Sequence, residues 1–226
     1  MSADGTCPQC GAAIGAVMPG LPVLTCASCQ ALLLIERGTA TKVGEAGTVP
    51  FDVSPIQLGT TLLVDGKRGE VVGRERWAWD GGSWNEWLLN LPGGDHRWVA
   101  EEAGQYMVMA PVTLHAAEAN KLAELGGKGD AALGQRLQVG ERWFTVADIK
   151  TIRCVASEGH LPVPVPANCP RQSLDLRSAG SQVLTWQNDR NGSGCWIGQY
   201  QRLAELAPAR LRELAGWGKP DFESAP

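Results

Sequence analysis

The sequence predicts a mainly β protein: an N-terminal four-cysteine ribbon, then two related small β barrels or sandwiches, with short helices between these units and at the C-terminus. Three observations predict it. Four cysteines form two closely spaced pairs near the N-terminus. The 226 residues include 28 glycines and 14 prolines and few long helical patterns, which favours short strands and many turns. A strand-turn-strand pattern also occurs twice along the chain.

The N-terminal module, predicted over residues 1–38, is defined by Cys7, Cys10, Cys26 and Cys29. Two Cys-x-x-C pairs separated by a short segment have the spacing of a four-thiolate zinc site, for which iron is the main rival metal. Four protein thiolates leave no open coordination position for water or substrate, so we expect a structural zinc ion. Ribbons also bind proteins or nucleic acids; the few charges here make nucleic acid the weaker alternative.

Residues 39–56, rich in glycine and threonine, are predicted to be a linker, with an ordered strand-and-turn connection as the alternative. A first β unit is predicted over residues 57–126 and a second over residues 127–226. Their openings, at 58–64 and 133–139, share an L-G pattern.

A Gly-Gln-Tyr also recurs, at 104–106 and 198–200, which supports two diverged copies of one fold over chance similarity. The sequence interval between matching positions of the two units is larger at their ends than at their starts. This indicates an insertion in the second unit, which we assign to the proline-rich segment 159–170. Helical spacing predicts a helix over 113–125, with Thr113 as the candidate cap, and a short C-terminal helix from Pro208 to Gly216. We favour a docking role for this second helix over a partner-binding one.

The segment from Glu70 to Trp98 holds five of the nine tryptophans. Its Asp-Gly-Gly-Ser sequence predicts a hairpin turn that places Trp79 opposite Trp84. Alternation then puts one set of side chains on one sheet face and a second set on the other. The first set is Trp77, Trp79, Trp84, Glu86 and Leu88. The second set is Arg74, Arg76, Trp87 and Leu89.

The candidate binding or structural residues of this hairpin are Trp84, Glu86 and Trp87. Glu86 shares a face with tryptophans, so we expect it to be buried, with a partner from backbone amides or from the second unit. We favour a structural bracket over the acidic point of a binding site, because no second titrating group is evident beside it. The tryptophans are more typical of core packing than of a stacking platform.

Catalytic residues are not predicted. Cys154, Cys169 and Cys195 lie outside the ribbon, with His160 among them, so a Cys/His-dependent hydrolase or transferase using Cys195 is an alternative. Free cysteines are commonly small buried hydrophobic residues, and the role of these three stays open.

The net charge of −4 disfavours nonspecific binding to polyanions. The N-terminus lacks the features of an export signal, and the longest apolar run, Ala31–Ile35, is far too short for a membrane span. Seven cysteines, four of them in metal-type pairs, indicate reduced thiols. We therefore expect a cytoplasmic location.

These residues resemble a bacterial family known as domain of unknown function 4178. The resemblance rests on the C-P-x-C-G of residues 7–11, the L-G-T of 58–60, the W-x-E-W of 84–87, the W-V-x-E of 98–101 and the E-G-x-L-P of 158–162. The chain departs from the family pattern at His160, where an acidic residue is common, and at Gln30, where glycine is usual. Members look like accessory proteins encoded beside phage-shock-protein-A-like or spermidine-synthase-like proteins.

The closed metal site, the lack of a catalytic set and the resemblance together favour a non-enzymatic zinc-ribbon interaction or accessory module. The resemblance implies a membrane-stress or polyamine-linked system. We expect a protein partner and no transmembrane segment, with a peripheral membrane-associated complex left open. The alternatives are the Cys/His enzyme and a nucleic-acid-binding ribbon protein.

Overall fold

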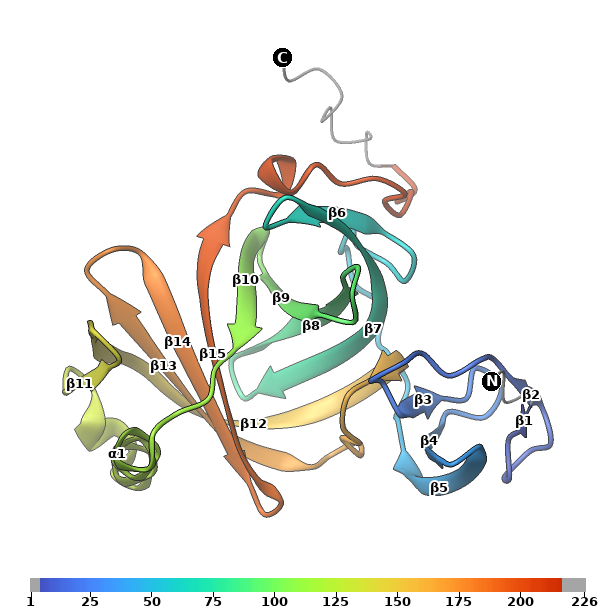
Figure 1. The fold of residues 1–226 in the computed structure, drawn as a ribbon, viewed down its shortest axis with the longest axis horizontal. Helices are drawn as coiled ribbons and strands as arrows, with labels where there is room; N and C mark the ends of the chain where they lie inside the picture. The colour runs from blue at the N-terminus through green and yellow to red at the C-terminus, as the bar shows by residue number, and fades with distance from the viewer. Residues whose placement is uncertain (1–4, 217–226) are drawn as a thin grey trace.

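The computed structural model describes residues 5–216; the first four residues of the predicted ribbon and the last ten of the predicted second unit lie outside this range. The mainly β fold is confirmed (Figure 1). Its strands are β1 (Gly5–Thr6), β2 (Ala13–Ile14), β3 (Val23–Thr25), β4 (Ala31–Glu36), β5 (Thr39–Glu45), β6 (Thr61–Val64), β7 (Lys67–Trp79), β8 (Gly82–Asn90), β9 (His96–Glu102), β10 (Gln105–Pro111), β11 (Arg136–Val139), β12 (Arg142–Leu161), β13 (Pro170–Ser178), β14 (Gln182–Asp189) and β15 (Gly192–Gln201).

Eight strands close into a barrel. Strands β6 to β10 of the first unit and β11 to β15 of the second each pair in sequence as antiparallel hairpins. The two sets are then joined twice, because β10 pairs with β15 and β7 pairs with β12. The closed order is β7-β8-β9-β10-β15-β14-β13-β12. The two units therefore share one barrel, which only their mutual pairing completes.

Each unit also curls around a core of its own outside the shared barrel. The first core includes Trp87, Leu89 and Val99, and the second includes Phe144 and Trp186. Further apolar residues, Trp77 and Leu88 among them, fill parts of the barrel interior. Burial of these large side chains is the main stabilising contribution to such a fold.

The two units begin in the same way at the atomic level. Gly59 donates its N–H to the carbonyl of Val71 (2.8 Å), and Gly134 donates to Val146 (2.9 Å). Both glycines have φ near +80°, a left-handed conformation that favours glycine. A bulge follows at the matching place in β7 and in β12.

The Gly-Gln-Tyr correspondence is wrong. Its first copy lies where β10 begins, whereas its second copy lies near the end of β15. Pairing sets Met107 opposite Tyr200, so the two motifs do not hold equivalent places in their hairpins. A three-residue match carries too little information to fix a strand register.

The ribbon continues the barrel sheet. Strand β3 pairs with the end of β12, setting Leu24 opposite His160. Strand β5 pairs with β4 and so orders residues 39–45, which were predicted to begin the linker. The ordered alternative holds for that stretch, because its backbone groups complete the ladder of β4. The proline-rich insertion begins as strand, since β12 runs to Leu161.

The helices are short. Helix α1 spans Ala116–Gly127, and its N-cap is His115 rather than the predicted Thr113. The side chain of Glu118, three residues later, accepts a hydrogen bond from the His115 N–H (2.8 Å). Short 3-10 helices occur at η1 (Gly129–Ala132) and η2 (Leu203–Leu206). Within residues 5–216 no helix is both long and apolar enough to cross a membrane.

The helix predicted from Pro208 to Gly216 is not formed. Ala209 pairs instead with Thr61 of β6 through two backbone hydrogen bonds of 3.0 Å. Ala207 and Arg210 have positive φ, which ends any helix there. The segment thus covers an edge of the first unit as extended chain.

Candidate functional site

The four predicted metal ligands meet at one point. The sulfur atoms of Cys7, Cys10, Cys26 and Cys29 all lie within 4.8 Å of one another. Sγ of Cys7 lies 3.7 Å from that of Cys29, and Sγ of Cys10 lies 3.8 Å from that of Cys26. Four sulfurs about 2.3 Å from a tetrahedral zinc ion would be separated by about 3.8 Å. The cluster can therefore hold a metal ion of this size.

Matching turns support both cysteine pairs. Gly11 donates its N–H to the carbonyl of Cys7 (2.9 Å), and Gln30 donates to that of Cys26 (2.8 Å). Gln30 takes the left-handed backbone conformation (φ 60°) usual for the glycine that the family pattern has there. This departure from the pattern leaves the turn intact.

The predicted hairpin forms, but in a different register. Trp77 pairs with Trp84, and Glu75 pairs with Glu86. The expected pairing of Trp79 with Trp84 is wrong, because Gly82 already belongs to β8 and pairs with Trp79. The rings of Trp79 and Trp84 still lie 5.6 Å apart between centroids as diagonal neighbours.

Glu86 lies inside the barrel and is 7% exposed. It accepts hydrogen bonds from Nε1 of Trp84 (3.0 Å) and from Nε2 of Gln187 in the second unit (3.2 Å). The sequence predicted that Glu86 is at least partly buried, with a partner either from backbone amides or from the second unit; the structure shows the latter. Burial raises the pKa of Glu86 above its ordinary value, since a buried carboxylate loses its hydration.

Sequence reasoning missed Glu75, which lies directly opposite Glu86. It is 3% exposed and accepts a hydrogen bond from Nε1 of Trp77 (3.1 Å). Burial, and next the charge of Glu86, raise the pKa of Glu75 to about 7. The alternation of Glu75 with Trp77 along β7 was the available signal, because it places both side chains on one face.

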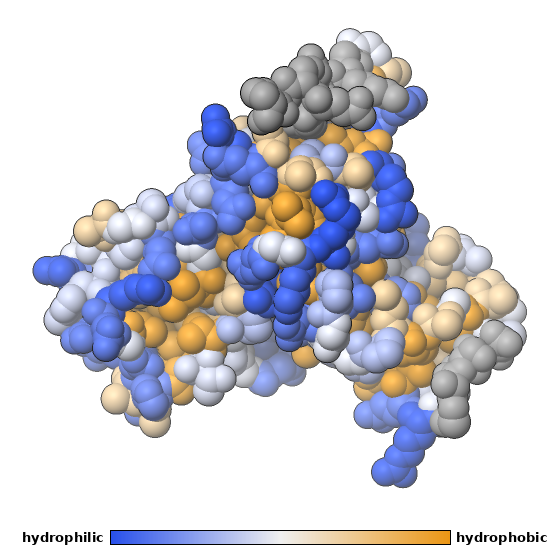
Figure 2. All heavy atoms as spheres, turned by 45° about the horizontal axis from the view of Figure 1, so that its top comes forward, coloured by the Kyte–Doolittle hydropathy of each residue, from blue (hydrophilic) through white to orange (hydrophobic). Residues whose placement is uncertain are grey.

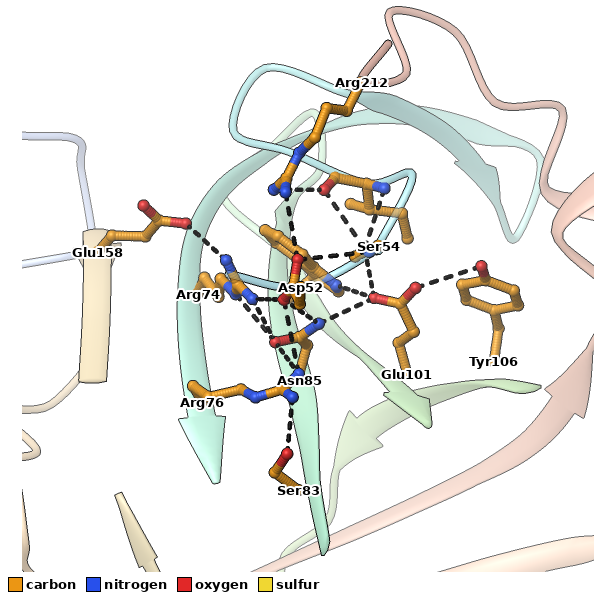
Figure 3. Close-up of polar contacts among 12 residues, drawn as sticks. Asp52, Ser54, Arg74, Arg76, Ser83, Asn85, Glu101, Tyr106, Glu158 and Arg212 are labelled. Carbon is orange, nitrogen blue, oxygen red and sulfur yellow. Dashed lines mark hydrogen bonds and ion pairs between the residues drawn. The ribbon is translucent and has the colours of Figure 1, made fainter. Parts of the chain in front are cut away.

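Trp87 points the other way, and its Nε1 donates to Glu101 of a buried polar network in the first unit. Figure 3 shows this network. Asp52 is its centre: it forms ion pairs with Arg74, with Arg76 (3.5 Å) and with Arg212 (3.2 Å). Burial alone would raise the pKa of Asp52. The charges of Arg74 and Arg212 and the hydrogen bonds from Asn85 and Ser54 outweigh burial, so the pKa of Asp52 is lowered. The Asp52 carboxylate thus joins its own segment to β7 and to the C-terminal segment that carries Arg212.

Glu101 is the second acceptor of this network. Its Oε2 accepts hydrogen bonds from Oγ of Ser54 (2.6 Å), Nδ2 of Asn85 (3.1 Å) and Nε1 of Trp87 (2.8 Å). Tyr106 donates its hydroxyl to Oε1 (3.3 Å), and burial, then Glu101, raise the pKa of that hydroxyl. Asn85 bridges the two acceptors, because its Nδ2 also donates to Oδ2 of Asp52 (3.2 Å). Its Oδ1 accepts from Arg74 (2.6 and 3.0 Å).

A cleft of about 1030 Å³ opens beside this network. Its walls combine the apolar side chains of Val53, Leu203 and Leu214 with the guanidinium groups of three arginines. Those arginines are Arg76, Arg202 and Arg212. Nε of Arg76 is buried and has no hydrogen-bond partner among residues 5–216. Figure 2 shows hydrophobic and strongly hydrophilic residues side by side over this part of the molecule.

The structure does not bring Cys195 and His160 together. Cys195 is 6% exposed, packs in the core of the second unit, and burial raises the pKa of its thiol to about 12. His160 lies beside the ribbon, and burial lowers its pKa. Cys154 is buried against Trp77, and its N–H donates to the carbonyl of Cys169 (3.3 Å), which lies just before β13. A buried, protonated thiol without an adjacent base is a poor nucleophile.

A family model described as "Domain of unknown function (DUF4178)" matches residues 57–201, which contain the whole barrel but not the four-cysteine cluster. No curated protein and no solved structure matches the chain.

Proposed function

This chain belongs to the DUF4178 family, and from that premise we propose that it is a non-enzymatic interaction module whose cleft binds a segment of a protein partner. In this proposal a structural zinc ion stabilises the ribbon. The system that it serves is a membrane-stress or polyamine-linked one, as the family resemblance implies, and its location is the cytoplasm.

The cleft of the first unit is the observation that carries this proposal. At about 1030 Å³ it reaches the upper end of the sizes typical of ligand sites, and it combines apolar walls with a few convergent polar groups. The network beneath it is pre-organised, because Asp52, Asn85 and Glu101 are already held by several hydrogen bonds each. A fixed polar floor lowers the entropy that a partner must lose on binding.

The chemistry of the lining indicates the kind of segment. Apolar side chains of the partner would pack on Val53, Leu203 and Leu214, and an acidic side chain would accept hydrogen bonds from Arg76 or Arg202. Arginine presents several donors in a planar fork that suits carboxylates. The two carboxylates of the floor, Asp52 and Glu101, have partners of their own and do not oppose such a ligand.

A pair of matched variants tests the proposal. Val53 is 51% exposed in the cleft, and Leu133 is 48% exposed in the second unit. Val53→Asp should weaken the capture of the partner from native lysate, because it places a carboxylate among the apolar contacts, whereas Leu133→Asp should not. Quantitative mass spectrometry of the captured proteins measures both. Equal loss with both variants, or none with either, contradicts the cleft as the binding site.

A Cys/His enzyme is the weaker candidate, since the Cys195 thiol is buried in a core. Nucleic-acid binding is weaker too, because the net charge is −4.

A further inference from the structure

The barrel interior holds two hollows, separate from the cleft. One, of about 530 Å³, lies near the proline-rich loop after β12, and the other, of about 120 Å³, lies toward Asp175 and Tyr200. Glu86 and Gln187 line both hollows, so these two residues lie at the narrow place between the hollows. Glu75 also lines the larger hollow, directly beside Glu86.

The charges at this narrow place are unbalanced. Neither Glu75, Glu86 nor Asp175 forms an ion pair with a lysine or arginine in the part of the chain that the structure describes. The guanidinium of Arg171 partly offsets the rise in the pKa of Glu75 and Glu86, but it is held by other groups: it pairs with Asp189 (2.8 Å) and donates to Gln187 (3.1 Å). Burying carboxylates without an ion pair is unfavourable, so a cation would stabilise this interior.

Unused hydrogen-bond acceptors face one another here. Indole N–H groups occupy Oε2 of Glu75 and Oε1 of Glu86, and within residues 5–216 the other oxygen of each carboxylate accepts no hydrogen bond. Ser157 adds a third group. It is 1% exposed, its hydroxyl has no partner among the described residues, and it pairs directly with Glu75 across β12 and β7. Directly paired residues lie on the same face of a sheet, so this hydroxyl is on the face that carries Glu75 and, one strand further, Glu86.

We propose that the barrel interior binds the ammonium group of a small primary amine between Glu75, Glu86 and Ser157. An ammonium group has three N–H donors, which matches two carboxylate oxygens and one hydroxyl. Trp77 and Trp84 flank the carboxylates, and Trp98 and Trp196 line the larger hollow, so indole surface surrounds the carbon chain of the amine.

A divalent metal ion fits less well. Such an ion needs several oxygens drawn together within one small coordination sphere. Among residues 5–216, only the four-cysteine cluster gathers three or more metal-type ligand atoms within 4.8 Å. Glu75 and Glu86 therefore have no third ligand atom of this kind within that distance in the described part of the chain, whereas an ammonium group needs only three hydrogen-bond acceptors around it.

Nuclear magnetic resonance of the zinc-loaded, nitrogen-15-labelled full chain tests this proposal, with butylammonium chloride as the probe. The indole N–H signals of Trp77 and Trp84 should shift in a saturable way, because those N–H groups donate to the two carboxylates. The signal of Trp143, half exposed outside the barrel, is the internal control and should not move. Butyrate and 1-butanol supply the same carbon chain without the positive charge and should leave all three signals in place.

The double variant Glu75→Gln/Glu86→Gln should weaken butylammonium binding about tenfold or more, since both charge-assisted hydrogen bonds are lost. Glu70→Gln, an exposed change on the same strand, should bind as the unaltered protein does. The proposal is overturned if 1-butanol shifts the same indole signals, if butylammonium shifts none, or if the folded double variant keeps its affinity. Should the double variant not fold, the indole shifts in the unaltered protein decide alone.

Discussion

Replacing Glu75 by glutamine should change how stability depends on pH. Glu75 is buried, and its pKa rises from 4.5 to about 7 on folding. The folded protein therefore binds a proton more tightly than the unfolded chain does. Its free energy of unfolding must then fall as pH rises from the unfolded pKa toward the folded one, because ionising Glu75 inside the barrel is unfavourable. Glutamine resembles the protonated acid and has no such ionisation.

The size of this effect follows from the shift. One pKa unit corresponds to about 1.4 kcal/mol, so the full effect of a shift from 4.5 to about 7 is about 3 kcal/mol. About 2 kcal/mol of it develops between about pH 5.5 and about pH 8. Across that range the glutamine variant should gain about 2 kcal/mol relative to the unaltered protein, most of it below about pH 7.5.

Urea unfolding of the zinc-saturated proteins at a series of pH values measures this difference. Loss of zinc at low pH affects both proteins alike and cancels in the comparison. Ser173→Ala, a neutral change inside the same barrel, is the control and should keep a constant difference from the unaltered protein. A difference for Glu75→Gln that stays constant with pH, or one that moves in favour of the unaltered protein as pH rises, would refute the reasoning.

Three further predictions follow from the other sites. Metal analysis should find one zinc ion per chain, lost in Cys10→Ala; stoichiometric zinc in that variant would contradict the assignment. Arg74→Leu should lower the free energy of unfolding by about 3–5 kcal/mol, because it leaves buried acceptors without their donor. Arg210→Leu removes only the exposed Arg210–Glu70 pair and should cost about 1 kcal/mol or less. Equal effects of the two variants in urea unfolding would argue against the buried network. An alkylating reagent near neutral pH should not modify Cys195 selectively, since burial keeps its thiol protonated; selective labelling in peptide mass spectra would revive the enzyme alternative.

Part of the candidate site could be predicted from sequence because it depends on near neighbours. The two cysteine pairs are each held by a local turn, so spacing alone indicated the ligands. The burial of Glu86 followed from its alternation with tryptophans along a strand. The cross-strand partner of Glu86 did not, because a shift in register changes which residue lies opposite, and the turn sequence allowed more than one closure.

The network of the first unit could not be predicted. Asp52 lies in a segment expected to be a linker, and its partners Arg74 and Arg212 come from a strand and from a segment expected to be helical. None of these residues stands in a recognisable motif, because the ion pairs form only when three distant segments meet.

The sequence by itself determined the mainly β fold, the four-cysteine cluster that could hold a metal ion, the faces of the β7–β8 hairpin and the paired L-G openings, because short-range spacing and alternation encode them. Only the tertiary structure decided that the two units share one barrel. The pairings of β7 with β12 and of β10 with β15 join strands far apart in the chain, and no local pattern specifies them. Those pairings bring Gln187 to Glu86 and set Ser157 opposite Glu75, so the chemistry of the barrel interior exists only in the folded protein.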